Sequence, residues 1–200
     1  MSATHARDLR TGRSPWLSRP LAKLPEKPLR RDITTDVIVV GAGISGAMVA
    51  DALTEAGLKV VILDRRGALK GSTPASTALL QYEIDTPLTE LAARIGLVRA
   101  ERIWRRSKLA LDALRERCGY LGIKADLEVR DTLYLAGDVL DREGLEREAA
   151  ARRRAGFEVS LLPGAEVRER YGLAARAAIL GHGNLAADPR RLAAGFLRAA

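Results

Sequence analysis

The residues best suited to chemistry are three glycines, spaced Gly41-x-Gly43-x-x-Gly46, directly after an apolar run. The first glycine permits a sharp turn, the second lets a pyrophosphate approach the main chain, and the third lets a helix pack closely on a strand. Amides at the start of that helix would meet the phosphates at the positive end of the helix dipole. The candidate phosphate-binding set is Gly41, Ala42, Gly43, Ile44, Ser45 and Gly46. The spacing predicts a dinucleotide site.

A carboxylate stands where the ribose of such a ligand would lie. Asp64 ends the apolar run 60–63, at the distance expected for an acid that accepts hydrogen bonds from a ribose with a free 2'-hydroxyl. Arg65 follows this acid rather than replacing it. A ligand with a 2'-phosphate is therefore not favoured.

Two apolar runs must position these residues. Residues 37–40 are β-branched, and residues 60–63 are β-branched apart from Leu63. Both runs suit strands buried on both faces, and the crossover between them is long enough for one helix. The pattern predicts a βαβ unit with parallel strands. A membrane span is not expected, because glycines and Ser45 interrupt the apolar stretch and Asp51 ends it short of about 20 residues.

The loop after the acid is rich in small and hydroxylic residues. Its hydroxyl side chains are those of Ser72, Thr73, Ser76 and Thr77. Such side chains can donate to phosphate or ribitol oxygens, and the loop leaves the carboxyl end of a strand, where ligands of this fold bind. We expect a cofactor-binding role, and the alternative is an ordinary surface turn.

Together, the glycine fingerprint, Asp64-Arg65 and the segment from Gly71 to Leu80 resemble the D-amino-acid-oxidase-like superfamily of FAD-dependent oxidoreductases. This superfamily includes glycine and sarcosine oxidases and flavin-linked glycerol-3-phosphate dehydrogenase. The resemblance implies an extended FAD with its adenosine end near Asp64 and the Ser/Thr loop running toward the flavin. Amine-oxidase relatives usually carry Gly-Gly-Arg after the acid, which this chain lacks.

Most of the formal charge of +8 lies in the first 31 residues, where eight basic side chains accompany two acids. The basic residues are Arg7, Arg10, Arg13, Arg19, Lys23, Lys27, Arg30 and Arg31. Four prolines predict an extended arm, which Trp16 would anchor to the body. No apolar secretory segment and no nucleic-acid-binding signature accompany the charge, so we expect a cytoplasmic protein without a nucleic-acid partner.

The sequence offers few ligands for metals and no residue to which catalysis can be assigned. Cys118 is the only cysteine, which indicates a core position, and His5 and His182 lie far apart. No metal site is therefore predicted. His182 is expected in a turn over residues 181–184, with a substrate contact as the alternative. In the resembling family, residues that contact substrate come mostly from later parts of the chain.

Downstream, capping residues and apolar spacing predict further elements. We expect helices over 88–95, from about 103 to 118, over 141–155 and over 163–171, and a last helix that begins with Asp188-Pro189. Strands are expected over 127–136, 157–162 and 177–180. In the longer helix, the stripe Ile103, Trp104, Ser107, Leu111, Leu114 and Cys118 should be buried.

The predicted fold class is α/β, with an incomplete Rossmann-type FAD-binding βαβ unit followed by the start of a mixed α+β substrate domain. The predicted divisions are a basic arm (1–34), an FAD-binding part (35–118), a substrate-domain part (119–183) and a helix returning toward the FAD domain (184–200). Because two parallel strands make a poor sheet, their apolar sides should remain partly exposed. The chain is therefore expected to be an N-terminal part of a longer enzyme.

The predicted function is oxidation of a small amine, amino-acid or hydroxy substrate by hydride transfer to FAD, with an unknown electron acceptor. Two alternatives stay open. One is an NAD-dependent enzyme, and the other is a non-catalytic nucleotide-binding module whose basic arm binds an acidic partner. Deletion of residues 1–31 is expected to leave flavin binding largely intact.

Overall fold

The structure is a computed structural model that describes residues 12–200. Three residues singled out in the sequence, His5, Arg7 and Arg10, lie outside the described part. The chain divides into two compact units. Unit 1 comprises residues up to Ala78 together with Tyr120–Asp126 and Asp188–Ala200, and unit 2 comprises Leu79–Gly119 and Leu127–Ala187.

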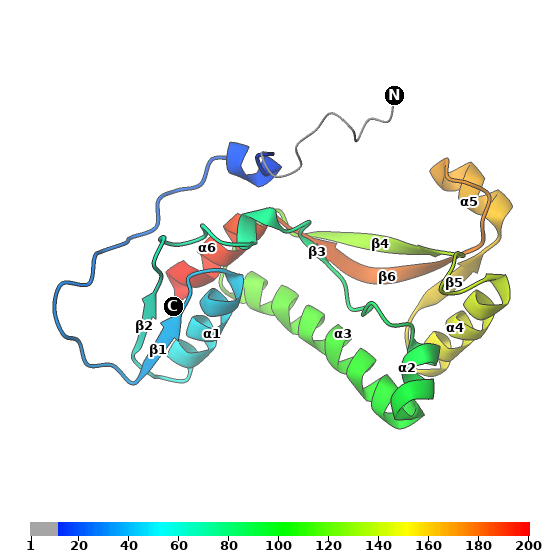
Figure 1. The fold of residues 1–200 in the computed structure, drawn as a ribbon, viewed down its shortest axis with the longest axis horizontal. Helices are drawn as coiled ribbons and strands as arrows, with labels where there is room; N and C mark the ends of the chain where they lie inside the picture. The colour runs from blue at the N-terminus through cyan, green and yellow to red at the C-terminus, as the bar shows by residue number, and fades with distance from the viewer. Residues whose placement is uncertain (1–11) are drawn as a thin grey trace. The chain divides into compact units, whose positions relative to one another are not determined.

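Unit 1 contains the predicted βαβ unit (Figure 1). Its elements are the 3-10 turn η1 (Pro15–Ser18), β1 (Val37–Val40), α1 (Ile44–Glu55), β2 (Val60–Leu63), the 3-10 turn η2 (Thr73–Ala75) and α6 (Pro189–Ala199). Strands β1 and β2 pair in parallel, with Val37 opposite Val60 and Val40 opposite Leu63. The predicted strand, turn, helix and strand are therefore confirmed.

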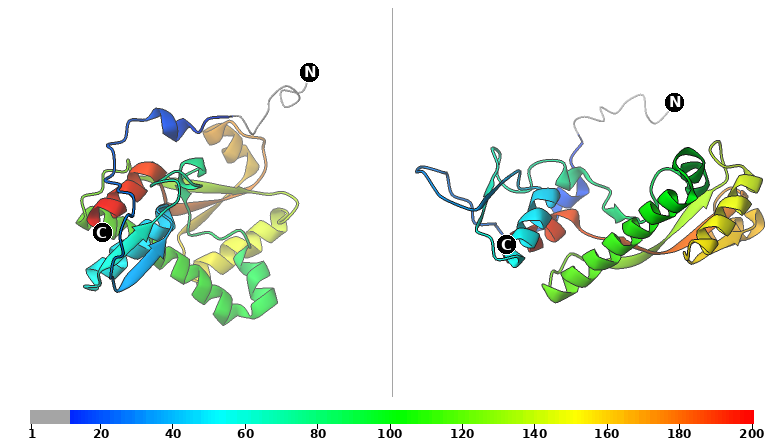
Figure 2. Two further views of the ribbon diagram at one scale, coloured as in Figure 1. Left: turned by 60° about the vertical axis from the view of Figure 1, so that its left-hand side comes forward. Right: turned by 90° about the horizontal axis from the view of Figure 1, so that it is seen from below.

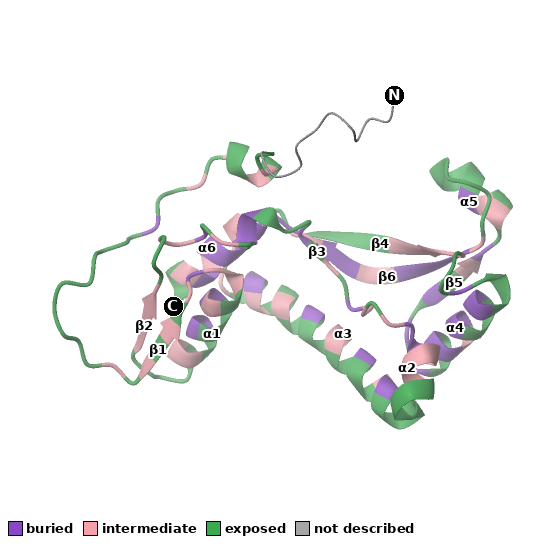
Figure 3. Cartoon of the chain, in the orientation of Figure 1, coloured by how far each residue is buried: buried purple, intermediate pink, exposed green. Residues whose placement is uncertain are grey.

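One face of this small sheet lacks a cover in the described part of the chain. Val39 faces α1, whereas Ile38 is 56% exposed and Val40 is 85% exposed. Alternate residues of a strand point to opposite faces, so the helix shields only one side. In Figure 3 the two strands are mostly pink, the colour of intermediate burial, whereas α1 carries buried residues in purple. The predicted partial exposure is confirmed.

From residue 12 onward the arm is extended apart from η1 (Figures 1 and 2). Several polar contacts hold it to the rest of unit 1. The indole N–H of Trp16 donates to the Ser76 carbonyl at 2.8 Å, as expected of an anchor. Arg190, on α6, donates to the Trp16 carbonyl at 2.6 Å. Asp188 caps α6 by accepting from the amides of Arg190 and Arg191, and α6 packs against α1.

Unit 2 is built around an antiparallel sheet. Its elements are β3 (Leu79–Leu80), α2 (Leu88–Ile95), α3 (Leu97–Tyr120, whose last residue belongs to unit 1), β4 (Glu128–Leu135), α4 (Arg142–Arg154), β5 (Val159–Leu162), α5 (Gly164–Tyr171) and β6 (Ala178–Ala186). Within the described residues, β6 pairs with β4 along one edge and with β5 and then β3 along the other. It is the central strand.

An aromatic cluster forms the core between this sheet and its helices. Tyr82 stacks on Phe157 with ring centroids 5.3 Å apart, and Trp104 of α3 meets both rings edge-on. The Arg152 guanidinium lies 4.6 Å from the centre of the Trp104 ring. Arg152 also donates to buried Glu148 at 2.7 Å, and Glu148 in turn accepts the amides of Leu88 and Thr89 at the start of α2.

Two local predictions are wrong. Residues 181–184 form part of β6 rather than a turn, because a bulge between Arg130 and Thr132 absorbs the irregular backbone of Gly183. Asn184 is buried there and accepts the Tyr82 amide at 3.0 Å. Ile103 is exposed, whereas Trp104 and Cys118 are buried as expected.

The observed division of the chain differs from the predicted boundary at residue 118. Residues 79–119 cluster with the antiparallel sheet rather than with the βαβ unit, because Leu88, Ala100 and Trp104 pack into the aromatic core. Residues 184–186 complete β6 and so belong with unit 2. Of the predicted returning segment 184–200, the part that belongs to unit 1 is Asp188–Ala200.

Candidate cofactor-binding site

The glycine turn after β1 has the geometry that its spacing predicts. Gly41 has φ of +111°, a conformation that favours glycine, and its amide donates to the Leu63 carbonyl at 2.8 Å. A Cβ on Gly46 would collide with the Gly41 carbonyl oxygen and lie 3.3 Å from Val39 Cγ1. Gly46 therefore lets α1 approach the end of β1.

Thr73 brings the hydroxyl-rich loop onto the start of α1. Its side chain is buried, and its Oγ1 accepts the Ile44 amide at 3.0 Å. A Cβ on Gly43 would lie 3.1 Å from the same oxygen. The structure thus joins two separate parts of the predicted site, the glycine turn and the loop.

Asp64 is exposed at the end of β2 and contacts the same turn. Its Oδ2 accepts the Ala42 amide at 3.0 Å, and its Oδ1 accepts the Arg66 amide at 2.8 Å. The amides of Ala42 and Arg66 hold the pKa of the Asp64 carboxyl below its usual range. Asp64 is therefore a fixed anionic acceptor beside the turn.

The other polar side chains predicted to bind the cofactor are exposed to solvent. Ser45 is exposed on α1, and Arg65 is exposed beside Asp64. Ser72, Ser76 and Thr77 are also exposed, and Ser76 Oγ accepts the amide of Ala78 at 3.0 Å. Of the four hydroxyl side chains predicted in the loop, Thr73 is the one that reaches the turn.

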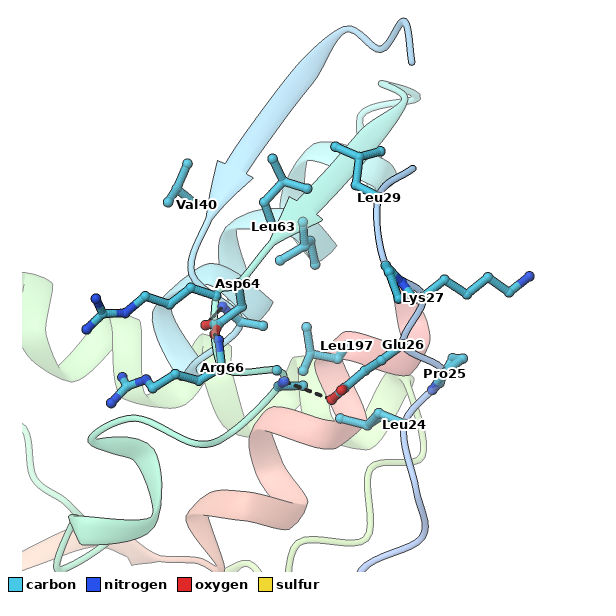
Figure 4. Close-up of a pocket in the computed structure, with 16 residues that line it drawn as sticks. Leu24, Pro25, Glu26, Lys27, Leu29, Val40, Leu63, Asp64, Arg66 and Leu197 are labelled. Carbon is cyan, nitrogen blue, oxygen red and sulfur yellow. Dashed lines mark hydrogen bonds between the residues drawn. The ribbon is translucent and has the colours of Figure 1, made fainter. Parts of the chain in front are cut away.

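A pocket of about 780 Å³ opens beside Asp64 (Figure 4). One wall comprises the ends of β1 and β2 with the residues that follow them, and the other is the arm segment 24–29. The arm's part in this wall was not predicted. No apolar period or motif in the arm signals it, since the segment lies about 40 residues before Asp64 and is placed by tertiary contacts.

Other kinds of site are not found in the described residues. Within 12–200, no group of three or more His, Cys, Asp or Glu side chains could hold a metal ion. No helix of that part is long and apolar enough to cross a membrane. His182 Nδ1 lies 3.0 Å from Asp131 on the sheet of unit 2.

Several known proteins resemble this chain in sequence or in fold. The chain is 31% identical over 93 residues to YhfW of Bacillus subtilis (strain 168), provisionally described as a Rieske 2Fe-2S iron-sulfur protein; the match covers 46% of this chain and 18% of that protein. Glycine oxidase from Geobacillus kaustophilus is 25% identical, with a TM-score of 0.58, over 82% of this chain and 44% of that chain.

A third relative was solved with its flavin. The L-alpha-glycerophosphate oxidase from Mycoplasma pneumoniae, with FAD bound, is similar in fold, with 19% identity and a TM-score of 0.60 over 84% of this chain and 42% of that chain. The present chain therefore spans less than half the length of each of these three proteins. Residues 36–200 match the family described as FAD dependent oxidoreductase, so the chain belongs to that family.

Proposed function

We propose that this chain binds the adenosine diphosphate part of FAD and contributes the first part of a substrate domain to an oxidoreductase. The observation that carries the proposal is the turn at Gly41–Gly46, which Asp64 and Thr73 hold in place by accepting the Ala42 and Ile44 amides. Backbone amides at a helix start suit a pyrophosphate, and a fixed carboxylate nearby suits a ribose hydroxyl. The match to an FAD family favours FAD over NAD.

Each residue has a separate task in this proposal. Gly43 leaves space for the pyrophosphate, Gly46 keeps α1 close to β1, and Thr73 orients the start of α1 through the Ile44 amide. Asp64 accepts from the ribose while its own position is held by the Ala42 amide. When bound, FAD supplies the hydride-accepting ring.

The proposed substrate is a small amine, amino acid or hydroxy compound whose C–H bond lies beside the nitrogen or oxygen. Support comes from relatives named glycine oxidase and L-alpha-glycerophosphate oxidase.

A flavin titration of the purified protein tests the proposal. Tighter binding of FAD than of NAD is expected, together with a flavin absorption spectrum. Gly43→Val should abolish FAD binding, because the branched side chain would occupy the approach of the pyrophosphate and press on Thr73 Oγ1. Gly119→Ala is the control, since a Cβ there meets no atom within 4 Å. NAD binding tighter than FAD binding would refute the proposal.

Asp64→Ala should weaken FAD binding by about 1–3 kcal/mol, the range for an unpaired polar partner. The measurement is the dissociation constant of FAD, and Asp32→Ala, an exposed acid of the arm outside the pocket, is the control. Unchanged FAD affinity in Asp64→Ala would mean that a residue other than Asp64 accepts the hydrogen bond from the ribose.

A cytoplasmic location without a nucleic-acid partner is part of the same proposal. Arg19 of the arm is paired with Asp126 at 2.7 Å and with Asp188 at 3.2 Å, so part of the arm's charge is already neutralised. Cell fractionation and a polyanion-binding assay test these two points.

A further inference from the structure

The arm segment 24–29 is a wall of the pocket beside Asp64, although it forms no helix or strand. Figure 4 shows its residues on one side of the pocket and the end of β2 on the other. One apolar side chain on each wall is largely exposed, Leu29 at 56% and Val40 at 85%. Exposed apolar side chains that line a concave surface indicate a ligand with an apolar face.

Specific contacts hold this segment in place. Glu26 Oε1 accepts the Ala68 amide at 2.8 Å, four residues after Asp64 in the chain. Leu24 is buried against Leu69 and Ala193. On the N-terminal side, Arg198 of α6 donates to the Ala22 carbonyl at 2.9 Å. Hydrogen bonds and the apolar packing of Leu24 therefore both fix the arm segment.

The chemistry of the two walls suits a nucleoside. Asp64 provides an acceptor at the pocket, while Leu29 and Leu63 provide apolar surface from opposite walls (Figure 4). Ligand pockets combine apolar side chains with a few polar groups that fix the orientation of the ligand. Ala42 of the glycine turn lines the same pocket, so a nucleoside placed here would have its phosphates beside the turn.

We propose that arm segment 24–29 closes over the adenosine end of FAD, with Leu29 as a contact to the purine and Glu26 as the residue that positions the segment. This inference rests on the proposed function. It replaces the expectation that removal of residues 1–31 leaves flavin binding intact. Truncation before residue 32 should weaken FAD binding substantially.

The first test uses the full-length apoprotein with FAD and ADP as probes. Leu29→Ala should raise the dissociation constants of FAD and ADP by the same factor, about five- to tenfold, because an apolar contact is lost. Leu17→Ala is the matched control, since Leu17 is an exposed leucine of the arm outside the pocket. The melting temperature of apo Leu29→Ala should stay unchanged, because the side chain is mostly exposed before binding.

The second test measures hydrogen exchange over residues 24–31 with and without ADP. ADP should slow exchange there in the wild type, and Glu26→Ala should remove most of this protection and raise both dissociation constants about tenfold. Lys23→Ala, an exposed arm variant outside the pocket, should behave as wild type.

The outcomes separate this inference from the proposed function. Wild-type protein that fails to bind FAD would overturn the proposed function and the inference together. FAD binding that is equal in wild type, Leu29→Ala and Glu26→Ala would overturn the role of the arm alone. A weakened FAD affinity with unchanged ADP affinity would also overturn it, because the arm would then act away from the adenosine.

Discussion

The two units of this chain are stabilised in different ways. Unit 2 encloses three aromatic rings and a buried ion pair between its sheet and its helices. Unit 1 has a parallel pair of strands with one face exposed, and its small apolar cluster includes Leu24 from the arm. The difference shows that the part with the cofactor motif depends on peripheral contacts, whereas the other part has a conventional core.

The largest expected effect is at Glu148 in unit 2. Glu148→Ala should lower the free energy of unfolding by about 3–5 kcal/mol, because Arg152 would remain buried without its partner. Glu143→Ala, which removes an exposed i,i+4 pair from the same helix, should cost less than about 1 kcal/mol. Urea unfolding measures both, and equal losses would show that burial of the pair does not matter.

Gly46→Ala tests unit 1 by the same quantity, the free energy of unfolding. The added methyl group would meet the Gly41 carbonyl, so we expect a loss of about 1–3 kcal/mol and of FAD binding. Gly119→Ala in α3 has open space and should stabilise the protein by roughly 0.5–1 kcal/mol. A Gly46→Ala variant with normal stability and normal FAD affinity would contradict the close packing of α1 on the end of β1.

The stability contributed by the buried pair of Glu148 and Arg152 should depend on pH. Burial opposes ionisation of Glu148, but hydrogen bonds from Thr89 and Arg152 outweigh it and hold its pKa below the ordinary value of 4.5. The ionised form therefore stabilises the fold above that value, and this contribution is lost as the pH falls through the lower folded-state pKa.

Glu148→Gln should accordingly show a shallower loss of stability between about pH 6 and pH 3 than the wild type. The measurement is urea unfolding at several pH values, with Glu143→Gln as the control. A slope identical to that of the wild type would mean that Glu148 does not contribute to the acid sensitivity.

The smallest effect is expected on the exposed face of unit 1. Ile38→Thr should change the free energy of unfolding by no more than about 0.5 kcal/mol while reducing self-association, because the side chain is mostly in solvent. Val39→Thr, on the opposite face, should cost more. Light scattering and urea unfolding measure the two properties, and a large loss in Ile38→Thr would indicate that this face is covered.

Features that depend on local sequence were predictable. The glycine turn at Gly41, the cap of α4 at Asp141 and the Asp188-Pro189 start of α6 each follow from residues within one helical turn. The sequence predicts that Thr73 lies in a hydroxyl-rich loop, but not that its side chain contacts α1. The tertiary path of the loop decides that Thr73, rather than Ser76, makes this contact.

Features that depend on distant partners were not predictable. Gly181-His182-Gly183-Asn184 has the composition of a turn, but pairing with β4 and a hydrogen bond to Tyr82, 102 residues away, make it a strand. The arm wall of the pocket similarly depends on Glu26 meeting Ala68. In β6 the long-range pairing overrides the local preference, whereas in the arm the long-range contact decides where an extended segment lies.

The central position of β6 has a consequence for synthesis of the chain on the ribosome. Strands β3, β4 and β5 all pair with β6, which follows them in sequence. Until residues 178–186 emerge, these three strands lack that pairing partner, although α2, α3 and α4 can already form through local hydrogen bonds. The nascent chain should therefore pass through a stage in which helices precede the sheet and unpaired strand edges are accessible to chaperones.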